Sequence, residues 1–220
     1  MKEKVVIVGA GLFAEVIHCY LSSDGRYEVV GFSQSQEHIK HPEFLSLPVV
    51  PLENLEEHFA PDGCKIFIAI GYKNVNTVRA GFFLQLKARG YGFISYVHPS
   101  VKLWPNNKVG ENCFIFEDNT IQPFVEIGDD TILWSGNHVG HHSKIGRHCF
   151  IASHAVISGS CQIGDYCFIG VNATLRDGIT VAPSCIIGAG TLLMKSTKEK
   201  EVYVADPTKP FRRNSDQISF

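Results

Sequence analysis

The feature that most constrains this 220-residue chain is an aliphatic residue at every sixth position over nearly half of its length. The series has seventeen consecutive members: Val97, Leu103, Val109, Ile115, Ile121, Ile127, Leu133, Val139, Ile145, Ile151, Ile157, Ile163, Ile169, Leu175, Val181, Ile187 and Leu193. A helix repeats its apolar residues every three to four positions and a strand every second one, so neither explains a strict six. A fixed short period predicts a solenoid, in which each repeat buries its apolar face by stacking on its neighbours.

Two further features keep the same period. Glycine often follows the aliphatic residue, as in Val109-Gly110 and Ile145-Gly146. The residue four positions after the aliphatic one is usually small, as in Cys113, Thr131, Ser143, Cys149, Ala155, Cys161, Cys167, Ala173, Cys185 and Thr191. Most of the seven cysteines therefore stand where a small buried side chain is expected, and no CxxC pair exists. We interpret them as structural residues rather than metal ligands or disulfide partners.

Composition excludes several classes of function. The net charge is −2, which gives no electrostatic argument for a nucleic-acid partner or an anionic membrane surface. The apolar run Val5–Val8 is too short for a signal peptide, and no apolar stretch is long enough to predict a membrane span. With 45% hydrophobic and 19% charged residues, we expect a globular protein of the reducing cytoplasm.

The first 96 residues follow a different pattern. Apolar runs at 5–8, 27–32 and 65–71 predict buried strands, and apolar residues with helical spacing at 12–21 and 77–89 predict helices. Three shorter pieces complete the prediction: an extended segment at 47–50, a short helix at 52–59 and a strand at 93–96. Alternation of strands and helices predicts a small α/β domain with a parallel, Rossmann-like sheet.

The first predicted strand runs into the glycine turn Gly9-x-Gly11-x-x-Ala14. Such a turn lets backbone amides at a helix N-terminus approach a phosphate. An NAD site also needs an acidic residue at the end of the second strand, where this chain has Ser33-Gln34. We therefore favour a nucleotide diphosphate over NAD. The alternative is a tight turn that needs glycine only for its backbone conformation.

The repeat resembles that of the hexapeptide-repeat proteins, whose chain forms a left-handed parallel β-helix. The resemblance implies that three hexapeptides form one triangular coil, with the aliphatic and small residues inside. Most such proteins are acyltransferases that use acetyl-CoA, while others are carbonic anhydrases or structural proteins. The fold alone therefore does not determine the chemistry.

The two halves together resemble the bacterial sugar acyltransferases (the NeuD/PglD-like proteins), which include nucleotide-aminosugar N-acetyltransferases and sialic acid O-acetyltransferases. The segments that carry the resemblance are Val8–Glu15, Phe67–Gly71 and Val97–Ser100, together with the solenoid. The resemblance implies a homotrimer, with a sugar nucleotide on an N-terminal domain (1–96) and acetyl-CoA between neighbouring β-helices (97–195). A C-terminal tail (196–220) follows. The family's acidic pair after the second strand is missing here, which leaves the nucleobase open.

Five histidines lie between residues 138 and 154: His138, His141, His142, His148 and His154. Those at 142, 148 and 154 are six apart, so they occupy the same slot on successive faces, about 120° apart, and cannot converge on one ion. The solenoid also lacks the pair five residues apart that the hexapeptide carbonic anhydrases use. We therefore expect no metal site.

The family's catalytic histidine lies in a pattern that Val139–Gly146 matches at all but one position. The resemblance implies that His141 is the general base and that the Gly159 N–H stabilises the thioester oxyanion. Where the family has an acidic residue after the histidine, this chain has His142. The alternatives are an exposed loop histidine at 141 and a plain corner glycine at 159.

The remaining predicted site residues fall into two sets. The predicted substrate-binding residues are Gly9, Gly11, Leu12, Ser33, Gly71, Trp134, Asn137, His138 and His142. The predicted acetyl-CoA-binding residues are Gly159, Ala173, Gly178, Gly188 and Lys209, with Arg212 and Arg213 as further phosphate partners. Glycine and alanine are also what a solenoid needs at narrow places, and the basic tail is equally explained by solvation.

These observations predict acetyl-CoA-dependent N-acetylation of a nucleotide-linked amino sugar in the synthesis of a bacterial surface glycan. O-acetylation of a sugar or sialic acid needs the same base and stays open. So does a noncatalytic sugar-nucleotide-binding protein, which the missing acid beside His141 favours. A metal-dependent carbonic anhydrase is disfavoured by the histidine spacing.

Overall fold

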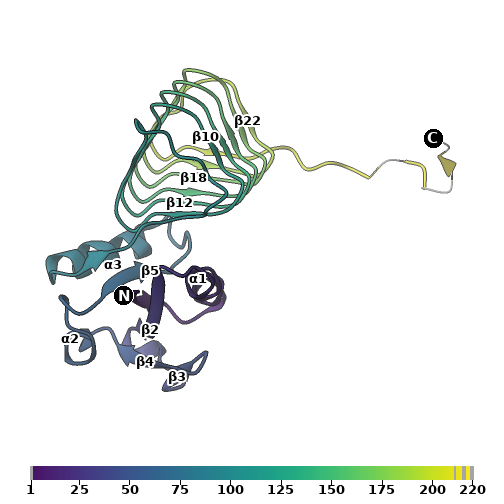
Figure 1. Cartoon of the computed structure of the whole chain (residues 1–220). Coiled ribbons are helices and arrows are strands. Elements are labelled where there is room, and N and C mark those ends of the chain that lie inside the picture. Colours follow the sequence, from purple (N-terminus) through teal and green to yellow (C-terminus); the bar gives the residue numbers. More distant parts are fainter. Residues whose placement is uncertain (1, 211, 215–216, 219–220) are drawn as a thin grey trace.

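A computed structural model describes residues 2–210, 212–214 and 217–218 of the chain. Figure 1 shows a triangular β-helix next to a smaller α/β domain, with the C-terminal tail extending away from both. This arrangement confirms the predicted fold class of a parallel α/β domain followed by a left-handed β-helix.

The N-terminal domain is one mixed sheet of six strands in the order β3-β4-β2-β1-β5-β6. Its elements are β1 (Glu3–Val8), α1 (Leu12–Ser23), β2 (Tyr27–Gln34), the 3₁₀ turn η1 (Gln36–His38), β3 (Glu43–Phe44), β4 (Leu47–Pro51), α2 (Leu55–His58), β5 (Lys65–Ile68), α3 (Thr77–Ala88) and β6 (Gly92–Phe93). All pairs are parallel except β3 with β4. Val5 to Val8 are all buried, as expected for a central parallel strand covered on both faces.

Two of the shorter predictions change. The helix predicted over 52–59 is only the single turn α2, because Leu55 is its one buried residue and supplies the apolar contact that holds it. The strand predicted over 93–96 is split between two sheets: β6 ends the N-terminal sheet, whereas β7 (Tyr96–Val97) pairs with the β-helix.

The β-helix consists of two-residue strands arranged in three parallel sheets. The first sheet contains β7, β9 (Phe114–Ile115), β12 (Ile132–Leu133), β15 (Phe150–Ile151), β18 (Phe168–Ile169), β21 (Ile186–Ile187) and β23 (Val202–Tyr203). The second contains β8 (Lys108–Val109), β11 (Glu126–Ile127), β14 (Lys144–Ile145), β17 (Gln162–Ile163) and β20 (Thr180–Val181). The third contains β10 (Thr120–Ile121), β13 (His138–Val139), β16 (Val156–Ile157), β19 (Thr174–Leu175) and β22 (Leu192–Leu193). Neighbouring strands in a sheet are three hexapeptides apart through most of the β-helix, as in Thr120 with His138, which confirms the predicted coil.

The chain turns each corner of the triangle through a residue in the left-handed region. From Asn112 to Gly190 every sixth residue has a φ between 53° and 74°, and most of these residues are not glycine. Such a conformation costs an L-residue roughly 1–2 kcal/mol. Each corner from Asp130 onward donates its N–H to a carbonyl on the preceding coil, as His148 does to Asp129 at 2.8 Å. The corner slot therefore explains why His142, His148 and His154 recur at intervals of six.

The interior of the coil is filled as the period predicts. The aliphatic series and the small residues form one continuous buried cluster, and burial raises the pKa of the Cys113 thiol to about 12. Leu103 is the exception: it is 37% exposed and belongs to no strand, because the third sheet begins only at β10. The predicted end at residue 195 is also too early, since β23 pairs with β21 and extends the ladder to Tyr203.

The two domains meet along the outer side of the first sheet (Figure 1). Phe114, Ile132 and Phe150 point outward from this sheet and share a buried cluster with residues of β1 and α1. A buried polar network lies beside this cluster. The Arg79 guanidinium, fully buried on α3, contacts the Asp130 carboxylate at 3.1 Å and donates to the carbonyls of Gly71 and Cys149. Arg79 thus ties α3, the loop after β5 and the β-helix to one another.

We expect Arg79→Met to lower the free energy of unfolding by about 3–5 kcal/mol, because the buried Asp130 carboxylate loses the guanidinium and keeps only its contacts with Asn112 and His148. The matched control is Arg147→Met, which breaks an exposed pair with Asp165 at 2.8 Å and should cost at most about 1 kcal/mol. Urea unfolding at one protein concentration measures both. Equal losses in the two variants would contradict the assignment of Arg79 as the link between the domains.

Candidate active site

His141 lies on the corner between β13 and β14, where the third and second sheets meet. Because the N-terminal domain covers the first sheet, this corner is the one opposite that domain. The coil of three hexapeptides stacks His141, Gly159 and Asp177 above one another at this corner. The backbone N–H of His141 donates to Gln122 Oε1 at 2.8 Å, and its side chain is exposed.

Gly159 has no side chain, and the side chains of His141 and Asp177 face the space that this leaves. A methyl group built on Gly159 would lie 3.0 Å from His141 Nε2 and 2.9 Å from Asp177 Oδ1. Both contacts are closer than side-chain atoms normally approach, so the His141 ring rests directly against the Gly159 backbone. A side chain at residue 159 would therefore displace the exposed His141 and Asp177 side chains, and glycine keeps them in this arrangement.

The Gly159 N–H is the second chemical group at this corner. No hydrogen bond between described residues uses it as the donor, whereas the equivalent N–H of His141 is occupied by Gln122. Gly140 occupies the position that Gln122 holds one coil earlier. It has no side chain and offers no such acceptor. A backbone N–H without a partner beside a histidine Nε2 can stabilise an oxyanion while the histidine accepts a proton.

The glycine turn lies at the carboxyl ends of β1 and β5, where the chain order of the sheet reverses. This is where ligands bind in open α/β sheets. Gly9 has a φ of 118°, and a methyl group on it would lie 2.8 Å from the Ala69 carbonyl oxygen, so it is needed for the backbone. Gly11 is the N-cap of α1, has an extended backbone, makes no side-chain cap and has open space around it. Backbone conformation alone therefore explains Gly9 but not Gly11.

A cavity of about 410 Å³ adjoins this turn. It is lined by Ala10, Gly11, Gln34, His38, Lys40, His41, Glu43, Phe44 and Val49. The side chain of Ser33, a predicted substrate contact, is fully buried beneath the turn, and its backbone carbonyl accepts the Gly9 N–H at 2.7 Å. Lys40 and the two histidines were not predicted, although a basic cluster just after the second strand was visible in the sequence.

A second cavity, of about 270 Å³, brings together three predicted substrate-binding residues. Leu12, Gly71 and Trp134 line it with Phe13, Val16, Tyr72 and Phe150. The Trp134 ring stacks on Phe116 at 4.5 Å, so one face of it is already occupied. Trp134 projects from the first sheet toward the N-terminal domain, on the side of the β-helix away from His141.

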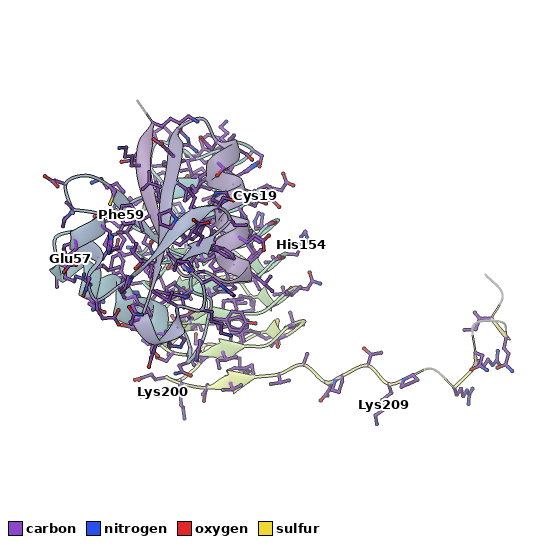
Figure 2. The ribbon with its side chains drawn as sticks, turned by 90° about the horizontal axis from the view of Figure 1, so that it is seen from below. Cys19, Glu57, Phe59, His154, Lys200 and Lys209 are labelled. Carbon is purple, nitrogen blue, oxygen red and sulfur yellow. The ribbon has the colours of Figure 1, made fainter. Side chains whose placement is uncertain are left out.

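Four other predicted site residues lie elsewhere. Asn137, a predicted sugar contact, is buried, and its amide oxygen accepts the Ala155 N–H at 2.8 Å inside the coil. The methyl group of Ala173, a predicted groove residue, is fully buried in the core. Gly188 stacks in the same column as Trp134, not as His141. Lys209 lies on the extended tail, away from the body of the molecule (Figure 2).

Gly178 and His138 are the remaining predictions. Gly178 occupies the left-handed corner slot, with a φ of 70°, one coil beyond Ser160 and two beyond His142, and so lies on the same corner as His141. His138 is half-buried on the outer face of β13, paired with Thr120 and Val156. Asp177 was missed, although counting three hexapeptides forward from Gly159 would have found it.

Two negative findings concern only the described part of the chain. Within it, no group of three or more His, Cys, Asp or Glu side chains could hold a metal ion. No helix there is both long and apolar enough to cross a membrane.

Comparison with known proteins agrees with both halves of this description. Residues 124–159 and 160–195 match the family model "Bacterial transferase hexapeptide (six repeats)", and residues 4–83 match "PglD N-terminal domain". No curated protein gives a significant sequence match.

Several solved structures share the fold. PerB from Caulobacter crescentus, in complex with CoA and GDP-perosamine, is 25% identical, covers 91% of each chain and has a TM-score of 0.78. A histidine variant of perosamine N-acetyltransferase from the same organism is 24% identical, covers 90% of this chain and 92% of its own, and has a TM-score of 0.81. The acetyltransferase domain of PglB from Neisseria gonorrhoeae, bound to acetyl coenzyme A, is 19% identical, covers 96% and 100%, and has a TM-score of 0.62.

The coil, its corner histidine and the two family matches define a bacterial hexapeptide transferase. With its PglD-type N-terminal domain, the chain belongs to the NeuD/PglD-like sugar acyltransferase family.

The substitution Gly11→Asp distinguishes phosphate binding at the glycine turn from a purely conformational need for glycine. An aspartate N-cap should leave the free energy of unfolding unchanged or raise it by up to about 1 kcal/mol. The same carboxylate would repel a phosphate at the helix N-terminus, so we expect the KM for a nucleotide-linked acceptor to rise roughly tenfold or more.

Gly11→Ser supplies a similar cap without charge and is the matched control. Thermal unfolding and steady-state kinetics provide the two readouts. A Gly11→Asp protein with an unchanged KM would show that no phosphate binds at this turn.

Proposed function

We propose that this protein transfers the acetyl group of acetyl-CoA to an amino group on a nucleotide-linked sugar. The observation that carries the proposal is the contact of the His141 ring with the Gly159 backbone on an exposed corner. A base and an oxyanion donor in this arrangement are what direct acyl transfer requires. No covalent enzyme intermediate is needed when both substrates bind together.

The reaction balances with these two groups. The acceptor ammonium first loses one proton to solvent, and the neutral amine then attacks the thioester carbonyl carbon. His141 Nε2 takes a second proton from the nitrogen as the bond forms, and the Gly159 N–H donates to the developing oxyanion. Collapse of the tetrahedral intermediate breaks the C–S bond, and the departing thiolate takes the proton from His141.

The acceptor is a nucleotide diphosphate sugar in this proposal. The free N-terminus of α1 and the Lys40 side chain, which lines the neighbouring cavity, suit the diphosphate. The cavity of about 410 Å³ suits a base and ribose. The likeness to PerB, whose structure holds CoA and GDP-perosamine, supports an amino sugar and leaves a guanine nucleotide among the candidates.

The acceptor cavity and the base belong to different copies of the chain. The cavity lies on the N-terminal domain, which covers the first sheet, whereas His141 lies on the opposite corner of the β-helix. One acceptor cannot reach both within one chain. A closed ring in which each base corner meets the neighbour's N-terminal domain satisfies this geometry, and a homotrimer supplies it. The seven free cysteines agree with a reducing cytoplasm as the site of the reaction.

The proposal predicts release of CoA thiol with one member of a panel of UDP-, dTDP- and GDP-linked amino sugars. His141→Ala should lower kcat/KM by about 10²–10⁴, the usual contribution of a general base. His154→Ala, at an exposed corner histidine away from the base, should leave it unchanged.

Panel members with a hydroxyl in place of the amine distinguish the acceptor atom. Turnover on these alone would replace N-acetylation by O-acetylation. Full activity in His141→Ala would show that another group is the base.

A further inference from the structure

His142 occupies the position next to His141, and its backbone and its ring are both held there. Its backbone has a φ of 60°, and its N–H donates to the Pro123 carbonyl at 3.2 Å. Its ring stacks on Phe124, one coil earlier, with ring centroids 4.5 Å apart and an interplanar angle of 24°. The side chain is exposed, yet these contacts define one orientation.

In this orientation the two histidines face each other through the same ring atom. His141 Nδ1 and His142 Nδ1 are 3.2 Å apart, and the rings are nearly perpendicular at 84°. Two nitrogens at this distance share a single proton, so one must donate and the other must accept.

The direction of this hydrogen bond determines whether His141 is a base. If His141 carries its proton on Nδ1, its Nε2 has a free lone pair directed at the gap over Gly159. If His142 is the donor, the neutral His141 carries its proton on Nε2 and cannot accept one from the acceptor amine. A partner that accepts at Nδ1 therefore sets the active tautomer of the base.

We infer that His142 is a positioning residue that accepts a hydrogen bond from Nδ1–H of His141 and so keeps Nε2 free to take the acceptor's proton. The inference rests on the proposed function for its chemistry, although not for the tautomer itself. An imidazole replaces the acidic residue that family resemblance leads one to expect here. When His141 becomes positively charged, His142 still accepts the hydrogen bond from its Nδ1–H but adds no negative charge.

Three substitutions at residue 142 separate the hydrogen bond from the packing. His142→Phe keeps a ring to stack on Phe124 but has no acceptor, and the corner slot already holds aromatic residues at Phe124 and Tyr166. His142→Asn and His142→Asp tolerate the left-handed conformation and provide an oxygen acceptor. His154→Phe makes the same change at another exposed corner and is the control for folding.

We expect kcat to fall roughly tenfold or more in His142→Phe with little change in KM, because part of the contribution of a positioned base is lost. His142→Asn should recover most of the activity, and His142→Asp should exceed wild type. In His142→Asp the acid limb of the pH profile of kcat/KM should also move to higher pH, because an added carboxylate favours the protonated base. Asp177, which faces the same ring across Gly159, is unchanged in all variants.

A second readout does not depend on turnover. In protein labelled with ¹⁵N-histidine, with His141 assigned through His141→Asn, the ring nitrogen shifts should show the Nδ1–H tautomer in wild type. They should show its loss in His142→Phe. The Nε2–H tautomer in wild type, or wild-type kcat in His142→Phe, would overturn the inference.

Failure of the proposed function has a different signature. It would appear as no turnover in wild type or as full activity in His141→Ala, and the tautomer measurement would still decide the role of His142.

Discussion

The left-handed corner at every sixth residue is the constraint on which the rest of the structure depends. It divides the chain into hexapeptides and closes each coil after three of them, so that residues three hexapeptides apart stack directly. From Asp130 onward, hydrogen bonds from each corner N–H to the preceding coil offset the cost of the conformation. Residues three hexapeptides apart in the sequence are therefore neighbours in space, and the side chains of successive coils form columns.

The stacking of residues three hexapeptides apart determines both the corner at His141 and the interface between the two domains. One column stacks His141 on Gly159 and Asp177, so a residue without a side chain lies between a histidine and a carboxylate. Another column places Asp130 where Arg79 of α3 reaches it, which fixes the N-terminal domain on the first sheet. That attachment holds the acceptor cavity on the far side of the β-helix from the base. In the proposed function, two copies of the chain are needed to bring the two halves of the site together.

Sequence reasoning predicted what depends on local pattern. The period of six specified the coil and its interior, and the glycine turn specified the start of α1. It missed the direction of individual side chains: Asn137 and Ala173 face inward and are buried, whereas His138 is half-buried and Asn172 is exposed. It also missed which side of the β-helix each column of stacked residues faces relative to the N-terminal domain. The docking of that domain depends on long-range contacts such as Arg79 with Asp130. Gly188 and Trp134 were consequently grouped with His141. Asn, Asp and Gly in many corner slots signalled the left-handed turn, and that signal was not used.

The central claim is that the base and the acceptor-binding turn act across two copies of the chain. Co-expression of His141→Ala with Gly11→Asp, under two affinity tags, tests it most directly. At an acceptor concentration well below the wild-type KM, His141→Ala should be nearly inactive and Gly11→Asp should keep about a tenth of the activity or less. Random mixing should restore about a quarter of all sites, which is about one site in three of each mixed trimer. Mixing His141→Ala with the double variant is the control and should regain nothing. If the two inactive variants also recover no activity in verified mixed oligomers, base and turn act within one chain and the account is wrong.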